Sequence, residues 1–126
     1  LNLIGVVYFF LSDFDTALDY CQRGLEVSKA IGDRRGECLV LPNIGKIYIE
    51  QELFADALEY FENALTLSQE LNVVEDIIGL YDGLGNFYAG RGLDSLAAVN
   101  YDNAVDVAEV TRSKLDIEAE KTSYAS

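Results

Sequence analysis

Cys21 and Cys38 are the side chains in this sequence best suited to metal binding or redox chemistry. A zinc site normally needs a full set of Cys, His or carboxylate ligands, and the chain contains no histidine. A disulfide between the two cysteines is the other functional alternative. We interpret both as small buried apolar residues that stay reduced in a cytoplasmic protein. The sequence therefore predicts no metal and no cofactor.

The absence of histidine also limits catalysis. Neither a Ser-His-Asp nor a Cys-His arrangement can be assembled from this chain. No Gly-x-x-x-x-Gly-Lys segment is present to bind a phosphate, and Gly79, Gly83 and Gly85 fall inside a helical pattern that indicates close packing. We therefore predict that the chain is not an enzyme.

Acidic residues form two groups that resemble metal ligands at first sight. One is the pair Glu75-Asp76, and the other comprises Asp13, Asp15 and Asp19. Neither group has the spacing of a calcium-binding loop. Both are more typical of helix caps and solvated helix faces.

The overall charge restricts the class of partner. The chain has 9 Lys and Arg against 22 Asp and Glu, which gives a formal net charge of −13. Such a surface repels nucleic-acid phosphates and anionic lipid, so we expect neither nucleic acid nor membrane as a partner. No uncharged apolar run approaches the length of about 18 residues that a membrane span requires. Basic or apolar partners remain open.

The chain matches itself twice when it is shifted by 40 residues, from Gly5 to Gly45 and from Gly45 to Gly85. The register holds without an insertion, and the same shift of 40 residues aligns further aromatic and small residues of the three copies. The aligned sets are Tyr8, Tyr48, Tyr88; Ala17, Ala57, Ala97; Cys21, Phe61, Tyr101; and Gly24, Ala64, Ala104. Such a fixed period indicates stacked structural repeats.

Each copy of the repeat contains two helical patterns. Leu41, Ile44 and Tyr48 recur at helical spacing in the first segment of the second copy. Ala57 and Phe61 lie on one face of the segment that follows. We therefore expect helical hairpins in which glycine and alanine allow close approach and aromatic residues fill the space between hairpins.

Residues at the ends of these segments are suited to terminating helices. Gly32 and Asn72 are equivalent, and both tolerate the left-handed conformation that closes a helix. Asp33 and Ser113 are also equivalent, and both are favoured N-caps. The sequence thus predicts a helix boundary near each pair.

Three further positions carry local predictions. Ser12 followed by Asp15 resembles a capping box, and Gly92 can adopt the backbone angles of a tight turn. Pro42 lies inside the first helix of the second copy, where we expect a tolerated kink.

This pattern resembles the tetratricopeptide repeat family. The residues that carry the resemblance are Ile44-Gly45-x-x-Tyr48, Phe54-x-x-Ala57, Phe61 and Ala64, with matching sets in the other copies. The link Gly32-Asp33-Arg34 resembles that of the longer-helix members. The departures from the family pattern are Asp94, Cys21, Gly24 and Glu52, the last of which replaces a turn glycine.

The resemblance implies an all-α fold, a right-handed α-solenoid of antiparallel helical hairpins. We expect one domain over 1–126, with repeat 1 over 1–32, repeat 2 over 33–72, repeat 3 over 73–112 and a C-terminal capping or truncated helix over 113–126. The chain opens on Leu1 and contains no Met, which is typical of a fragment of a longer protein.

The resemblance also implies that the first helix of each hairpin lines a concave surface that binds a protein or peptide. The expected binding residues are Asn2, Val6, Phe9, Phe10, Leu39, Asn43, Lys46, Ile49, Glu50, Asp82, Asn86 and Ala89. Their mixture of apolar, acidic and amide groups suits a partner with apolar and basic residues. Asparagines can bond an extended peptide backbone, and Lys46 can meet a carboxylate.

Several alternatives stay open at this point. Phe9 and Phe10 line a groove or are covered by a preceding hairpin. The leading hypothesis is a protein–protein interaction scaffold, and the alternative is a regulatory sensor segment of a larger signalling protein with an effector domain elsewhere. Self-association through exposed repeat ends is a further possibility.

Overall fold

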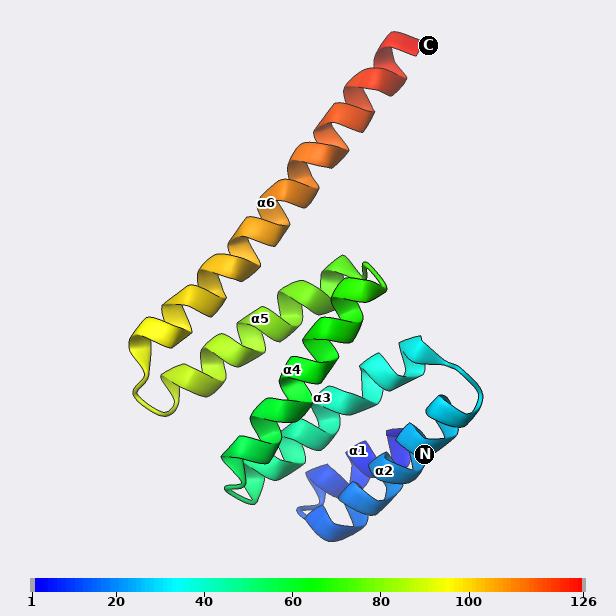
Figure 1. The fold of residues 1–126 in the computed structure, drawn as a ribbon, viewed down its shortest axis with the longest axis vertical. Coiled ribbons are helices and arrows are strands. Elements are labelled where there is room, and N and C mark those ends of the chain that lie inside the picture. Colours follow the sequence, from blue (N-terminus) through cyan, green and yellow to red (C-terminus); the bar gives the residue numbers. More distant parts are fainter. Residues whose placement is uncertain (1, 126) are drawn as a thin grey trace. The chain divides into compact units, whose positions relative to one another are not determined.

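A computed structural model describes residues 2–125, with side-chain environments through residue 123, and all of its regular elements are helices (Figure 1). The helices are α1 (Asn2–Phe10), α2 (Phe14–Ala30), α3 (Arg34–Glu50), α4 (Phe54–Glu70), α5 (Val74–Ala89) and α6 (Asp94–Ala125). Helices α1 and α2, α3 and α4, and α5 and α6 pack as hairpins. The predicted all-α hairpin architecture is confirmed. Leu1 and Ser126, which end the predicted domain, lie outside the described residues.

The helices fall into two compact units. The first unit, Leu1–Leu71, holds α1 to α4, and α2 packs against α3 within it. The second unit, Asn72–Ser126, holds α5 and α6. The extent of one domain over 1–126 and its repeat boundaries stay predictions.

Small residues allow the two helices of each hairpin to approach closely. Ala17, Ala57 and Ala97 are 0%, 0% and 4% exposed. A Cβ added at Gly5 would lie 2.5 Å from Cys21 Sγ and 3.1 Å from the Ala17 carbonyl oxygen. The repeated glycine and alanine therefore serve as the close-packing positions that the sequence predicts. The same prediction is wrong for Gly79 and Gly83, where an added Cβ would meet nothing within 4 Å, because no other helix approaches the backbone there.

Both cysteines contribute to the buried core of the first unit as free thiols. Cys38 Sγ lies 3.6 Å from the Ser68 hydroxyl. Burial raises the pKa of the Cys21 thiol, which disfavours its reactive thiolate form. The interpretation of the cysteines as small buried residues is confirmed.

The helix boundaries after α2 and α4 follow the predicted chemistry. Gly32 and Asn72 have φ angles of 72° and 55°, so both adopt the left-handed conformation that closes a helix. Asp33 caps α3 by accepting a hydrogen bond from the Gly36 backbone N–H at 2.9 Å. These predictions are confirmed.

The capping box predicted at Ser12 and Asp15 is wrong. Ser12 has a φ angle of 59° and belongs to the turn, as do the equivalent Glu52 at 60° and Gly92 at 72°. Asp13 is the cap of α2, because its carboxylate accepts from the Thr16 backbone N–H at 3.3 Å. The predicted turn at Gly92 is confirmed.

The helix boundary predicted at Ser113 is also wrong. Helix α6 runs without interruption from Asp94 to Ala125, so Ser113 lies inside it and caps nothing. The helix continues through Ser113 because of the residue immediately before it. Arg112 stands where Gly32 and Asn72 close the earlier helices, and arginine does not favour the left-handed conformation. The stretch 112–123 is exposed along its whole length.

Pro42 does not break α3, which is continuous from Arg34 to Glu50. Proline cannot donate to the carbonyl of Cys38 one turn earlier. The flanking Leu41 and Ile44 are buried, and this packing holds the helix together.

Candidate functional site

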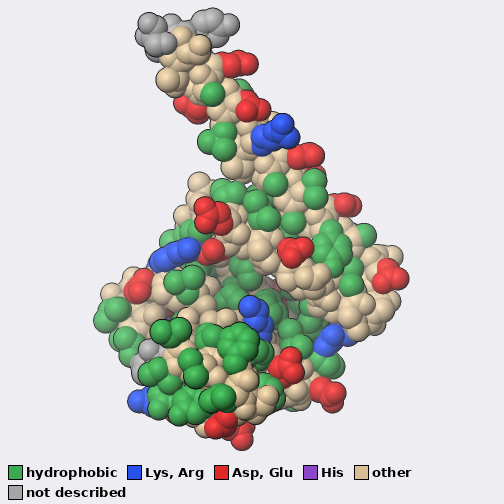
Figure 2. All heavy atoms as spheres, turned by 180° about the vertical axis from the view of Figure 1, so that it is seen from behind, with side chains coloured by type: hydrophobic (Ala, Val, Ile, Leu, Met, Phe, Trp, Pro, Cys, Tyr) green, Lys and Arg blue, Asp and Glu red, His purple; other side chains and the backbone are tan. Residues whose placement is uncertain are grey.

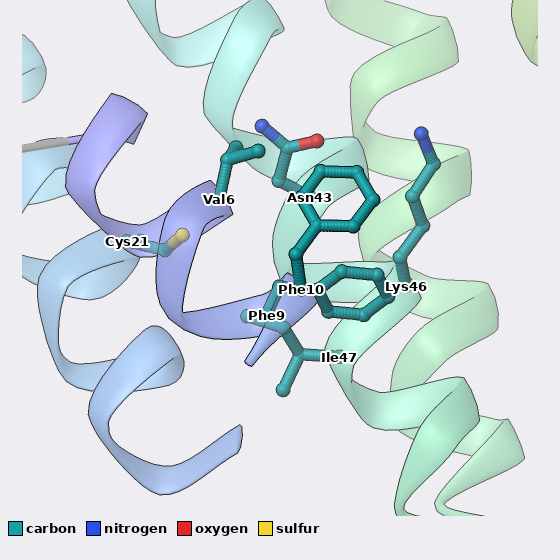
Figure 3. A pocket seen from close by; sticks show the side chains of 8 residues that line it. Val6, Phe9, Phe10, Cys21, Asn43, Lys46 and Ile47 are labelled. Atoms are coloured by element: carbon teal, nitrogen blue, oxygen red, sulfur yellow. The ribbon is translucent and has the colours of Figure 1, made fainter. Parts of the chain in front are cut away.

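Five of the predicted binding residues line one small pocket of about 90 Å³ in the first unit (Figure 3). Val6, Phe9 and Phe10 come from α1, and Asn43 and Lys46 come from α3. The remaining lining residues are Gly5, Cys21 and Ile47.

Helical spacing explains why these side chains converge. Residues three and four apart share one face of a helix. Val6, Phe9 and Phe10 have this spacing on α1, and the same spacing relates Asn43 to Lys46 and Ile47 on α3. Because α1 contacts α3, the two faces meet and leave a hollow between them.

The apolar wall of the pocket is aromatic. The rings of Phe9 and Phe10 are 5.9 Å apart and meet edge to face at 80°. Phe9 is also 5.7 Å from the ring of Phe14, which holds it in place. Phe10 is 79% exposed, so most of its apolar ring surface remains open to solvent.

The apolar surface extends beyond the pocket along α1 and into the turn that follows it. Leu3, Val7 and Leu11 are 76%, 50% and 68% exposed. Figure 2 shows hydrophobic side chains gathered over the N-terminal hairpin. An exposed surface of this kind is typical of an interaction site.

The polar edge of the pocket is formed by α3. The Asn43 side-chain nitrogen donates to the Asn2 side-chain oxygen at 3.1 Å and to the Leu39 carbonyl at 3.4 Å. Lys46 is exposed and extends beside the phenylalanine rings (Figure 3). Among the described lining residues it is the one cation.

The other predicted residues of the first unit lie outside this pocket. Asn2 and Leu39 line a second hollow of about 290 Å³ between α2 and α3, together with Val27, Ile31 and Val40. Leu39 is 50% exposed. Ile49 is half-buried and Glu50 is exposed at the end of α3, and neither lines these two hollows.

The predicted residues of the second unit, Asp82, Asn86 and Ala89, are exposed on α5. Asn86 accepts a hydrogen bond from the Tyr101 hydroxyl at 2.5 Å, so its side-chain oxygen is already engaged within the hairpin. The structure thus gathers only part of the predicted set into one site.

Sequence reasoning missed three residues that also line the pocket, Gly5, Cys21 and Ile47. The first two carried a usable signal. Gly5 is a close-packing glycine of the repeat, and Cys21 occupies the position of the bulky Phe61 and Tyr101. With a small residue at that position, Cys21 contributes to the lining of the pocket.

The described residues contain neither a helix suited to span a membrane nor a group of side chains suited to hold a metal ion. No helix is long and apolar enough to cross a bilayer. Over the same residues, no three His, Cys, Asp or Glu side chains form a group able to hold a metal ion.

A family model described as tetratricopeptide repeat matches residues 1–70. No curated protein matches the sequence.

Two solved structures are similar in fold. BtubC (BKLC) from P. vanneervenii has a TM-score of 0.76 at 20% sequence identity, over 86% of this chain and 44% of that protein. MamA has a TM-score of 0.67 at 20% identity, over 89% of this chain and 58% of that protein. This chain therefore spans about half the length of these structures. At such identity the likeness concerns the helical-repeat fold alone.

Proposed function

Because the chain belongs to the tetratricopeptide repeat family, we propose that it is a non-catalytic scaffold that binds a peptide segment of another protein on the face formed by α1 and α3. The observation that carries the proposal is the pocket lined by Val6, Phe9, Phe10, Asn43 and Lys46. It joins an exposed aromatic surface to a cation and an amide on the neighbouring helix.

The pocket fits one apolar side chain of the partner. Its volume of about 90 Å³ suits part of a leucine or phenylalanine side chain. Such a side chain would cover Phe10, which is 79% exposed, and would gain free energy by removing both apolar surfaces from water.

The polar edge would orient the partner's backbone. The Asn43 amide nitrogen is engaged by Asn2, so its side-chain oxygen is the group suited to accept from a peptide N–H. The Lys46 ammonium suits a peptide carbonyl or a carboxylate. Basic residues elsewhere in the partner would be attracted by the net charge of −13.

The compartment that we propose is the cytoplasm. Cys21 and Cys38 are free and buried, an arrangement suited to a reducing environment.

A display library of random peptides, selected on the intact chain, tests this function. We expect the selected peptides to share an apolar anchor residue. In fluorescence anisotropy, Phe10→Ser and Lys46→Glu should each weaken binding of such a peptide by about tenfold, the usual effect of losing an anchor contact.

Lys121→Glu is the matched control, because it makes the same charge change on an exposed residue of α6. It should change the Kd by less than about twofold at physiological salt. If Lys46→Glu and Lys121→Glu weaken binding equally, the α1–α3 face is not the binding site.

A further inference from the structure

The first two hairpins each contain a stacked pair of tyrosines at equivalent positions. The rings of Tyr8 and Tyr20 are 5.6 Å apart and inclined by 3°. The rings of Tyr48 and Tyr60 are 5.5 Å apart and inclined by 29°. In each case one ring comes from the first helix of the hairpin and the other from the second helix. The two pairs can therefore be compared position by position.

In the first hairpin, an arginine of the chain itself occupies the face of the tyrosine pair. The guanidinium carbon of Arg23 lies 5.1 Å from the centre of the Tyr20 ring, a cation–π distance. The same guanidinium is 3.5 Å from the Asp19 carboxylate. In the first hairpin, therefore, a guanidinium group contacts both an aromatic ring and a carboxylate at this position.

The second hairpin keeps the two tyrosine rings and the carboxylate but lacks the arginine. Asn63 stands at the position of Arg23, whereas Glu59 retains the carboxylate of Asp19. Asp56 replaces the neutral Thr16, so the second hairpin has one more acidic group at this place. The second hairpin therefore has no arginine of its own to stack on its tyrosines.

A cavity of about 310 Å³ lies at this place, entirely within the first unit. Tyr48, Tyr60, Asp56, Glu59 and Asn63 contribute aromatic rings and polar groups to its lining. Leu25, Lys29 and Leu41 complete the wall.

The electrostatic environment of this cavity favours a cation. Burial raises the pKa of Tyr60, and Tyr48, Glu59 and Asp56 raise it further through charge and hydrogen bonding. The carboxylates thus create a negative potential at the tyrosine hydroxyl.

We propose that the Tyr48–Tyr60 cavity binds an arginine side chain of a partner protein, in the position that Arg23 occupies in the first hairpin. The planar guanidinium can stack on a ring while its N–H groups bond to Glu59 or Asp56. Lysine fits less well, because its compact ammonium cannot stack flat on a ring while it also bonds to a carboxylate.

This surface is distinct from the α1–α3 pocket. Tyr48 follows Lys46 by two residues, which places it about 200° around the helix. The arginine subsite therefore goes beyond the proposed peptide-binding function, and each can fail without the other.

Lys29 is the one cation among the described residues that line the cavity. No described carboxylate forms a salt bridge with it, so its ammonium is not fixed against Asp56 or Glu59. It opposes a second cation through like charge but does not stack on the tyrosines as Arg23 does.

The test uses an acetylated, amidated peptide of alternating glycine and arginine, with lysine and citrulline versions as probes. Citrulline keeps the shape of arginine without its charge. In NMR titrations of the intact chain, the arginine peptide should shift the Tyr48 and Tyr60 signals. It should bind about threefold more tightly than the lysine peptide, while the citrulline peptide should not bind measurably.

Asn63→Arg is the decisive variant, because it gives the second hairpin the arginine of the first. It should weaken binding of the arginine peptide by about tenfold and remove the tyrosine shifts. Asn103→Arg is the matched control, since it adds the same charge at the equivalent position of the third hairpin, where Asn100 replaces the second tyrosine. It should weaken binding by less than about twofold.

Two further variants test the comparison between the hairpins. Arg23→Asn should expose the Tyr20 ring and add arginine-dependent shifts at Tyr8 and Tyr20, weaker than those at Tyr48 and Tyr60 because Thr16 stands at the position of Asp56. Lys29→Gln should strengthen binding by about twofold, because it removes a like charge. Equal weakening by Asn63→Arg and Asn103→Arg, or equal affinity for all three peptides, would overturn the proposal.

Discussion

The first helices of the first two hairpins carry the same pattern in the 40-residue register, yet one is buried and the other is open. Ile44 and Ile47 of α3 are 0% and 1% exposed. Their equivalents in α1, Ile4 and Val7, are 43% and 50% exposed. Sequence pattern alone therefore does not decide burial at these positions.

The difference follows from the neighbours of each helix. Helix α3 packs against both α2 and α4, whereas α1 packs on α2 and touches α3. A repeat helix buries its apolar face only when hairpins stand on both sides of it. Of the two phenylalanines at the α1–α3 pocket, Phe10 is 79% exposed and Phe9 is half-buried.

The largest expected effect contrasts equivalent isoleucines of α3 and α1. Ile44→Ala should destabilise the fold by about 3–4 kcal/mol, because it leaves a cavity in a packed core. Ile4→Ala removes the same atoms from a site that is 43% exposed and should cost about 1 kcal/mol or less. Urea unfolding of the two variants measures the difference. Equal costs would show that α1 is covered in solution.

The next contrast concerns the repeated glycine. Gly5→Ala places a Cβ 2.5 Å from Cys21 Sγ and 3.1 Å from a backbone carbonyl, so the helices must move apart. We expect the free energy of unfolding to fall by about 1–3 kcal/mol. At Gly45 the nearest atoms belong to the Phe61 ring at 3.0 Å, which can shift, and the loss should be smaller.

Gly83→Ala is the control for this pair, because a Cβ there meets nothing within 4 Å. It should stabilise the chain by about 0.5–1 kcal/mol through helix propensity. Thermal unfolding of all three variants checks the order. A Gly45→Ala loss larger than that of Gly5→Ala would contradict the closer approach of α1 and α2.

The same Glu→Gly substitution should change stability in opposite directions in a turn and in the middle of a helix. Glu52 has a φ angle of 60° at the position where the third hairpin has Gly92. Glu52→Gly should therefore stabilise the fold by about 0.5–1 kcal/mol by relieving the left-handed strain of a side-chain residue. Glu62→Gly, in the exposed middle of α4, should destabilise it by about 1 kcal/mol. A loss of stability on Glu52→Gly would mean that the turn is not strained.

The smallest effect is the pH dependence of the second hairpin. Because the pKa of Tyr60 is raised above its ordinary value of 10.0, mainly by burial, the folded chain holds the phenol proton more tightly than the unfolded chain. This contribution to stability is fully present below pH 10 and is lost as the pH rises through the folded-state pKa. In ultraviolet titration, Tyr60→Phe should remove the most alkaline phenolate transition. Retention of that transition in the variant would assign it to another tyrosine.

The hairpins, the close-packing residues and the turns at Gly32 and Asn72 could be predicted because they depend on local spacing and on a repeated register. The continuous α6 could not be predicted from Ser113 alone, because the preceding residue, Arg112, does not favour the left-handed conformation that closes a helix. The chain's own copies contained that information, since the earlier helices close on glycine or asparagine.

Prediction of the site was partial for a different reason. The family resemblance assigned Val6, Phe9 and Phe10 to the concave surface, but it does not reveal which side chains meet across two helices. The Asn43–Asn2 hydrogen bond and the presence of Cys21 in the pocket lining arise from tertiary packing. The tyrosine cavity likewise depends on tertiary structure, because it requires Tyr48 to stack on Tyr60. It also depends on Asn63 standing where the first hairpin has Arg23.

The most direct test of the central claim maps a selected peptide onto the chain by NMR. If the open face of α1 and its meeting with α3 form the binding surface, the largest shift changes should fall on Val6, Phe9, Phe10, Asn43 and Lys46. Changes concentrated on α6, or spread evenly over all helices, would contradict the account.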